Sequence, residues 1–242
     1  MISLCALWLY LLTIRNPTAG NMVMELTEGL KTRTSMRAFT KTPVPREIIA
    51  EILSEAHRAP SSSNQQPWNF HVITGKPLEA LCAKILAAHG NDRKPYDPSK
   101  GKTIPAQYVE RTKTLFRELR PFLQKLGEEN LSFIETGSLR FYNAPVAILL
   151  TIHNSFPRNR LMDIGMAAQN LMLAAHARGL GTCAIGFALF YEDIIRAEIA
   201  ISSDFDLTLM IALGYPDYNS PVNDFRSSRD ELSDCVSWIG FE

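Results

Sequence analysis

The chain has 242 residues, of which 46% are hydrophobic, and it carries 25 basic and 25 acidic side chains. This is enough for one domain with a substantial core. Zero net charge, with no long run of one sign, argues against non-specific nucleic-acid binding, which requires a basic face. Four cysteines lie far apart and form no CxxC pair: Cys5, Cys82, Cys183 and Cys235. This pattern favours free thiols and a cytoplasmic protein over a disulfide framework or a zinc site.

The N-terminus differs in character from the rest of the chain. Residues 1–14 are mostly apolar, but they are fewer than the roughly 20 that a membrane span needs. No positive region precedes them, so they make a poor signal peptide. Three interpretations stay open: an upstream start codon chosen in error, an anchor facing lipid or a partner, or an added hydrophobic arm. We expect residues 1–23 to lie outside the domain and residues 24–242 to form a single domain.

Hydrophobic periodicity and turn residues predict alternating helices and strands around one core. Helix 161–178 carries the clearest apolar stripe and ends at Gly179, whereas 146–152 is an almost wholly apolar, buried strand. Pro121 is expected to kink or divide the helix around it. In chain order, we expect helix 24–32, helix 45–59, strand 68–74 closed by Gly75-Lys76-Pro77, helix 78–89, loop 90–105, helix 106–126, strand 146–152, helix 161–178, and strands 180–187 and 207–215.

The segment Arg33-Thr34-Ser35-Met36-Arg37-Ala38-Phe39 places two fixed positive charges around two hydroxyls at the end of a predicted helix. Taken alone, these arginines could be a solvated pair. Guanidinium forks and short donors are, however, the groups that a phosphate requires. The segment is therefore a candidate phosphate site.

The segment Ala59-Pro60-Ser61-Ser62-Ser63-Asn64-Gln65-Gln66-Pro67-Trp68 supplies small hydroxyls, amides and two prolines. In isolation it is an ordinary polar loop. It leads directly into an apolar strand, so it lies beside the core, where ligands often bind. Neutral hydrogen-bonding groups at close range suit a ribityl chain and the edge of an isoalloxazine ring.

Other motifs carry less weight. The stretch Gly179–Gly186 follows a helix, enters a strand and lacks G-x-G-x-x-G spacing, so we reject a dinucleotide fingerprint, although its backbone could approach a flat ligand. Hydrolase and metal-site signatures are missing. Four aromatic residues fit either helix core or a substrate cage: Tyr108, Phe116, Phe122 and Phe133.

Taken together and in order, these segments resemble the FMN-dependent nitroreductase family. The resemblance runs from about Met24 to Phe241 and includes three further motifs: Asp163-Ile164-Gly165-Met166-Ala167-Ala168-Gln169-Asn170-Leu171, Gly179-Leu180-Gly181-Thr182 and Ala212-Leu213-Gly214-Tyr215-Pro216. It implies an α+β fold with a central, mainly antiparallel sheet flanked by helices. It also implies an intertwined homodimer that binds FMN at the subunit interface and uses NADH or NADPH as reductant.

The resemblance also implies the site residues. Those matched to the phosphate and the nearby flavin edge are Arg33, Thr34, Ser35 and Arg37, with Arg229 completing the phosphate site. Those matched to the flavin lining, from the other subunit, are Pro60, Ser61, Ser62 and Asn64. Ile185 and Gly186 would lie near the reactive edge of the ring. Many members carry an acidic residue where this chain has Ile185, so only a backbone role is expected there.

The implied activity is reduction of nitroaromatics, quinones or related small-molecule acceptors. A hydride would pass from NAD(P)H to flavin N5, and the acceptor would then take the same place, giving ping-pong kinetics. No side chain is assigned as catalytic and no metal is expected. Two alternatives stay open: a flavin-binding or storage protein without turnover, and a specialised reductive dehalogenase or flavin-degrading enzyme on the same scaffold. Residues 90–140, which vary in the family, would decide between acceptors.

Overall fold

The computed structural model describes residues 24–92 and 101–241. The chain divides between Thr32 and Arg33 into two units. The first contains the short helix α2, Leu26–Thr32, which ends where the sequence predicted. The second unit holds all the other described elements. Cys5 and the apolar stretch 1–14 lie outside the described residues, and the prediction of a domain running from residue 24 stays a prediction.

The second unit is built on one four-stranded sheet. Its strands are β1 (Trp68–Thr74), β2 (Val146–His153), β3 (Gly181–Ile185) and β4 (Phe205–Gly214), in the order β1-β2-β4-β3. All three pairings are antiparallel. The expected α+β fold with a mainly antiparallel sheet is therefore confirmed.

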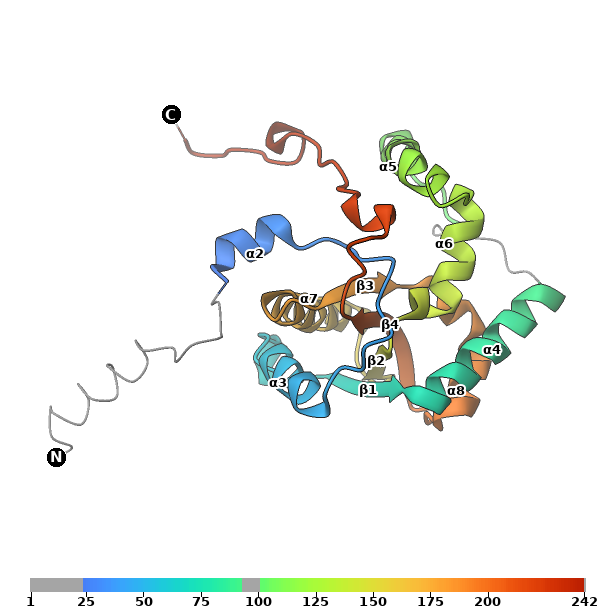
Figure 1. The fold of residues 1–242 in the computed structure, drawn as a ribbon. Coiled ribbons are helices and arrows are strands. Elements are labelled where there is room, and N and C mark those ends of the chain that lie inside the picture. Colours follow the sequence, from blue (N-terminus) through green and yellow to red (C-terminus); the bar gives the residue numbers. More distant parts are fainter. Residues whose placement is uncertain (1–23, 93–100, 242) are drawn as a thin grey trace, which may run out of the picture. The chain divides into compact units, whose positions relative to one another are not determined.

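Helices cover both faces of this sheet (Figure 1). The helices of the second unit are α3 (Arg46–Ala56), α4 (Gly75–Asn91), α5 (Ala106–Gln124), α6 (Asn130–Leu139), α7 (Leu161–Ala177) and α8 (Glu192–Ile199). The apolar faces of α3 and α7 pack on one side of the sheet, and α4, α5, α6 and α8 pack on the other. Among the described residues, no helix is long and apolar enough to cross a membrane.

Strand β2 shows why the layers form. Its residues alternate between the two cores: Val146, Ile148 and Leu150 join α3 and α7, whereas Ala147 and Leu149 join the opposite layer. Because successive side chains of a strand point to opposite faces, a strand covered on both sides must be apolar throughout. This is the pattern that predicted a buried strand.

Several boundaries differ from the sequence predictions. Helix α4 begins at Gly75, so Gly75-Lys76-Pro77 forms its first turn instead of a turn after β1. Proline is tolerated there because the first helical N–H groups have no intrahelical partner. Helix α5 continues through Pro121 without being divided. Helices α6 and α8 were not predicted, since both are short.

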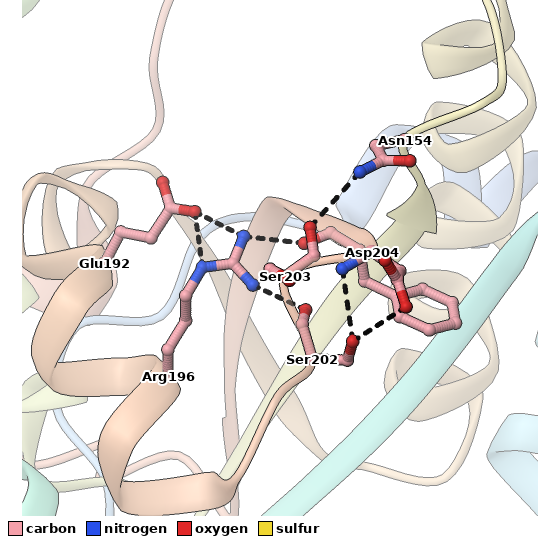
Figure 2. Close-up of polar contacts among 7 residues, drawn as sticks. Asn154, Glu192, Arg196, Ser202, Ser203 and Asp204 are labelled. Atoms are coloured by element: carbon pink, nitrogen blue, oxygen red, sulfur yellow. Dashed lines mark hydrogen bonds and ion pairs between the residues drawn. The ribbon is translucent and has the colours of Figure 1, made fainter.

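Arg196 of α8 fixes the turn between this helix and β4 (Figure 2). Its guanidinium donates to Glu192 Oε1 at 2.8 and 2.5 Å, to the Ser202 carbonyl at 2.8 Å and to the Phe205 carbonyl at 2.6 Å. Ala200 ends the helix in the left-handed conformation, with φ 51°. One side chain thus satisfies carbonyl groups on both sides of the chain reversal.

We expect Arg196→Met to lower the free energy of unfolding by about 1–2 kcal/mol, because the carbonyls of Ser202 and Phe205 lose their donor and Glu192 loses its ion pair. Urea unfolding followed by circular dichroism measures this change. Arg158→Met, which removes an exposed arginine, is the control and should change stability little. Equal losses in the two variants would contradict the structural role of Arg196.

Candidate functional site

The segment from Arg33 to Phe39 lies along the edge strand β3. Ser35 forms a parallel bridge with Thr182, and the Met36 N–H donates to the Thr182 carbonyl at 2.9 Å. Gly181 makes this approach possible, because a Cβ atom there would come within 2.6 Å of Met36 Cγ. The two predicted arginines are therefore held against the sheet.

Asn223 joins this segment to the C-terminal part of the chain. Its side-chain oxygen accepts the Arg37 N–H at 2.8 Å, and its amide nitrogen donates to the carbonyls of Ala38 and Asp217 at 2.8 and 3.0 Å. The side chain is buried. Because each contact satisfies a main-chain group, Asn223 fixes the backbone on which Arg37 stands.

Three of the predicted phosphate-site residues, Arg33, Ser35 and Arg37, lie around Cys183 of β3. Burial raises the pKa of the Cys183 thiol, and this rise is opposed by Arg37, a hydrogen bond with Ser35, and Arg33. Burial also lowers the pKa of the Arg33 guanidinium, and the charge of Arg229 lowers it further. Like charges are thus gathered at one edge of the sheet.

The arginines at this edge have no acidic partner. In the described part of the chain, no ion pair joins Arg33, Arg37 or Arg229 to a carboxylate. Arg229 donates instead to oxygens of Ser227 and Ser228 at 2.8–3.2 Å. Two half-buried arginines and an exposed one, none ion-paired to a described carboxylate, are the donor set that an anionic group such as a phosphate would satisfy.

A cavity of about 400 Å³ continues from the arginines along the end of β3. Arg37, Ile185 and Gly186 all line it. The Ile185 side chain is buried in the core and Gly186 is exposed, so the backbone is what this position offers to a ligand. The remaining wall is largely apolar and comes from α5, α6 and the turn after β3, with Phe116, Phe187 and Phe190 among its residues.

The four aromatic residues that fitted two roles are now distinguished. Phe116 lines the cavity, so it is the one placed to contact a substrate. Phe122 packs edge-on against Phe225, and Phe133 is part of the core. Tyr108 is exposed on α5, where its ring contacts the Arg111 guanidinium.

The polar loop before β1 is shaped by unusual backbone angles. Ser63, Asn64 and Gln66 have φ values of 52°, 53° and 46°, which non-glycine residues seldom adopt. Ser61 Oγ accepts the Gln66 N–H at 2.9 Å, and the Gln66 side chain donates to the Asn64 carbonyl at 2.7 Å. Because strained backbone is often retained at binding sites, this geometry supports a functional role for the loop.

Within a single chain, the polar loop before β1 and the arginines lie far apart. The pairing registers align Thr182 with Leu213, Val146 and finally Thr74, whereas the loop enters β1 at Trp68. Three strand spacings and six residues along β1 correspond to a diagonal of roughly 25 Å. Pro60, Ser61, Ser62 and Asn64 therefore occupy a different corner of the sheet from Arg33, Ser35 and Arg37.

Sequence reasoning missed three residues at the arginine corner: Tyr142, Cys183 and Asn223. Burial raises the pKa of the Tyr142 phenol to about 12. Its ring contacts Gly137 so closely that a Cβ there would lie 2.4 Å from Tyr142 Cε1. The only sequence signal for Asn223 was its place at the start of the polar segment that contains Arg229.

Comparison with known proteins yields consistent matches. The model of the nitroreductase family matches residues 30–215. A 4-nitrobenzoate reductase of Pseudomonas putida is 32% identical over 214 residues, covering 87% of this chain and 93% of that protein.

Solved structures agree. The FMN and NADPH-dependent nitroreductase NfnB of Sphigopyxis sp. strain HMH is 31% identical with a TM-score of 0.82, covering 90% of this chain and all of the other. The FMN-dependent NfnB of Mycobacterium smegmatis, solved with NADPH, is 31% identical with a TM-score of 0.79, covering 88% and 97%.

We expect Asn223→Ala to lower the free energy of unfolding by about 2–4 kcal/mol, since three main-chain groups lose their partner. Thermal or urea unfolding tests this. Asn219→Ala changes an exposed asparagine of the same segment and serves as the control. If the two variants are equally stable, Asn223 does not hold the arginine segment.

Proposed function

This chain belongs to the nitroreductase family, and we propose from that premise that it is an NAD(P)H-dependent FMN oxidoreductase that reduces nitroaromatic compounds. The observation that carries the proposal is the group of arginines without acidic partners beside an apolar cavity at the end of β3. The relatives named 4-nitrobenzoate reductase and the solved NfnB enzymes support the same reaction class.

In this proposal, Arg33 and Arg229 bind the FMN phosphate, together with the hydroxyls of Thr34 and Ser35. Without a ligand, the guanidinium groups of Arg33 and Arg229 repel each other. A phosphate dianion bound between them would attract both. The phosphate therefore removes the repulsion that lowers the pKa of Arg33. A bound phosphate would thus account for two arginines lying near each other without a carboxylate between them.

Arg37, Ile185 and Gly186 serve the ring. Arg37 would place a positive charge where the ring gains electrons, and backbone groups of Ile185 and Gly186 would hold its edge. Bound FMN supplies hydride transfer between a nicotinamide and an acceptor. The apolar wall around Phe116 excludes water, and the same space receives the reductant and the acceptor in turn, so ping-pong kinetics are expected.

A homodimer completes the site. We propose that the loop carrying Pro60, Ser61, Ser62 and Asn64 reaches the flavin held by the arginines of the partner subunit, because the two corners of one chain lie roughly 25 Å apart. Two exposed apolar surfaces are available for association. They are the open side of α7, with Leu161, Met162, Gly165 and Met166, and the C-terminal segment with Trp238, Ile239 and Phe241.

The proposed acceptors are nitroaromatics, with quinones as a second class to test, and the proposed location is the cytoplasm. The free thiols of Cys82, Cys183 and Cys235 support this location, because disulfides are rare in the cytoplasm.

We expect Arg33→Ala combined with Arg229→Ala to weaken FMN binding at least about a hundredfold, since two charge-assisted contacts are lost. The purified wild-type protein should show flavin absorbance near roughly 450 nm that bleaches with NADPH under argon. Arg158→Ala is the matched control. Unchanged flavin content in the double variant overturns the phosphate assignment, and flavin that no nicotinamide bleaches favours a binding protein without turnover.

We expect the protein to sediment as a dimer at micromolar concentration, and Met162→Glu to weaken the dimer and lower flavin content together. A charge placed on the open apolar face of α7 is desolvated on association. Leu126→Glu, at an exposed position after α5, is the control. A wild-type monomer that retains flavin would contradict the shared site.

A further inference from the structure

A second, smaller cavity lies on the other side of Arg37 and Tyr142 from the one at the end of β3. It has a volume of about 170 Å³, roughly the space of five water molecules. Its wall includes two arginines, Arg37 and Arg140, and three aromatic rings, those of Phe39, Phe133 and Tyr142. None of the described residues that line it is acidic. We call it the Arg37–Arg140 cavity.

Both arginines of this cavity have a buried donor without an acceptor. The Nε atoms of Arg37 and Arg140 are buried and have no hydrogen-bond partner. The rest of the Arg37 guanidinium contacts the Ser35 carbonyl, from Nη1 at 3.4 Å, and the Tyr142 hydroxyl, where it opposes the rise in pKa that burial causes. Within residues 24–92 and 101–241, the Arg140 side chain forms neither a hydrogen bond nor an ion pair. Leaving such groups unsatisfied is unfavourable, so the cavity lacks a negatively charged acceptor.

The wall between the two cavities is fixed by an unusual backbone. Phe141, Tyr142 and Asn143 have φ values of 52°, 52° and 58°, three successive non-glycine residues in the left-handed region. This conformation is costly and persists only where the surroundings impose it. It presses the Tyr142 ring against Gly137 and brings its hydroxyl to 3.3 Å from Ser138 Oγ. These contacts hold the Tyr142 ring in the wall that the two cavities share.

We propose that the Arg37–Arg140 cavity binds a small carboxylate, whose oxygens accept from the two guanidinium groups and whose apolar part packs against Phe39 and Phe133. A carboxylate supplies the acceptors that both buried Nε atoms lack. The aromatic walls favour an organic anion over a fully hydrated inorganic ion. The site lies outside the proposed phosphate contacts of Arg33 and Arg229, and it shares Arg37 and Tyr142 with the cavity at the end of β3.

Acetate is the probe, and acetamide is its neutral isostere. FMN-loaded protein is titrated with each by calorimetry at constant ionic strength set with sodium fluoride, so that the phosphate contacts are already occupied. Wild-type protein should bind acetate saturably and gain thermal stability with it, whereas acetamide should do neither. Absence of saturable acetate binding, or equal binding of acetamide, overturns the proposal.

Arg140→Gln identifies the site. Acetate affinity should fall at least about tenfold, because a charge-assisted contact is lost. Arg158→Gln removes the same charge from an exposed position and should bind acetate as the wild type does. Unchanged acetate affinity in Arg140→Gln would place acetate elsewhere, for example over the flavin, and would overturn the proposal.

The stability of Arg140→Gln without acetate supplies a second readout. Because the Arg140 side chain has no partner to lose, the variant should be at least as stable as the wild type. A large loss of stability that acetate does not influence would mean that another group, such as a carboxylate of a second chain, already fills the cavity, and it would overturn the proposal. A colourless protein that still binds acetate through Arg140 would overturn the proposed flavin function and leave this site standing.

Discussion

The arrangement of the candidate site depends on the buried Asn223 amide. It holds the main chain at Arg37, Ala38 and Asp217 in one set of hydrogen bonds, and so joins two segments almost 190 residues apart in the sequence. The segment it anchors is already paired with β3 through Ser35 and Met36. Without a bound anion, the positive charges at this edge repel each other and would push the segment away from the sheet. The side-chain and main-chain hydrogen bonds hold it in place.

The sheet order then separates the two polar groups. The strand order β1-β2-β4-β3 places the polar loop that precedes β1 beside one edge strand and the arginines beside the other. The offset of six residues along β1 increases the distance between them further. A fold of this kind can satisfy a ligand that is anionic at one end and flat at the other, provided that a second molecule supplies the missing side. In the proposed dimer, the partner subunit would supply the missing side, and the exposed apolar surface on α7 is available for that association.

Much of this could be predicted from the sequence, for physical reasons that differ by region. Strand β1 was predicted residue for residue, and the alternating burial of β2 follows from an apolar run with no polar gap. The clustering of Arg33, Ser35 and Arg37 followed from their short spacing. Helices α6 and α8 were missed, because short helices carry few periods of a pattern.

Long-range contacts account for the rest. Nothing in the sequence indicates that Asn223 would be buried against Arg37, or that Phe141, Tyr142 and Asn143 would adopt left-handed angles. Both features depend on which segments the fold brings together, and this cannot be inferred from the residue types at these positions. The Ile185 side chain is buried in the core, and the backbone role expected at this position stays a prediction.

The diagonal separation of the two polar corners has a genetic consequence if the site is shared. Each chain would contribute arginines to one flavin and a serine loop to the other. A subunit defective at the arginine corner, paired with one defective at the loop, would form a dimer with one intact site and one doubly damaged site. Two inactive alleles could then restore activity to each other in a mixed population, while two alleles damaged at the same corner could not.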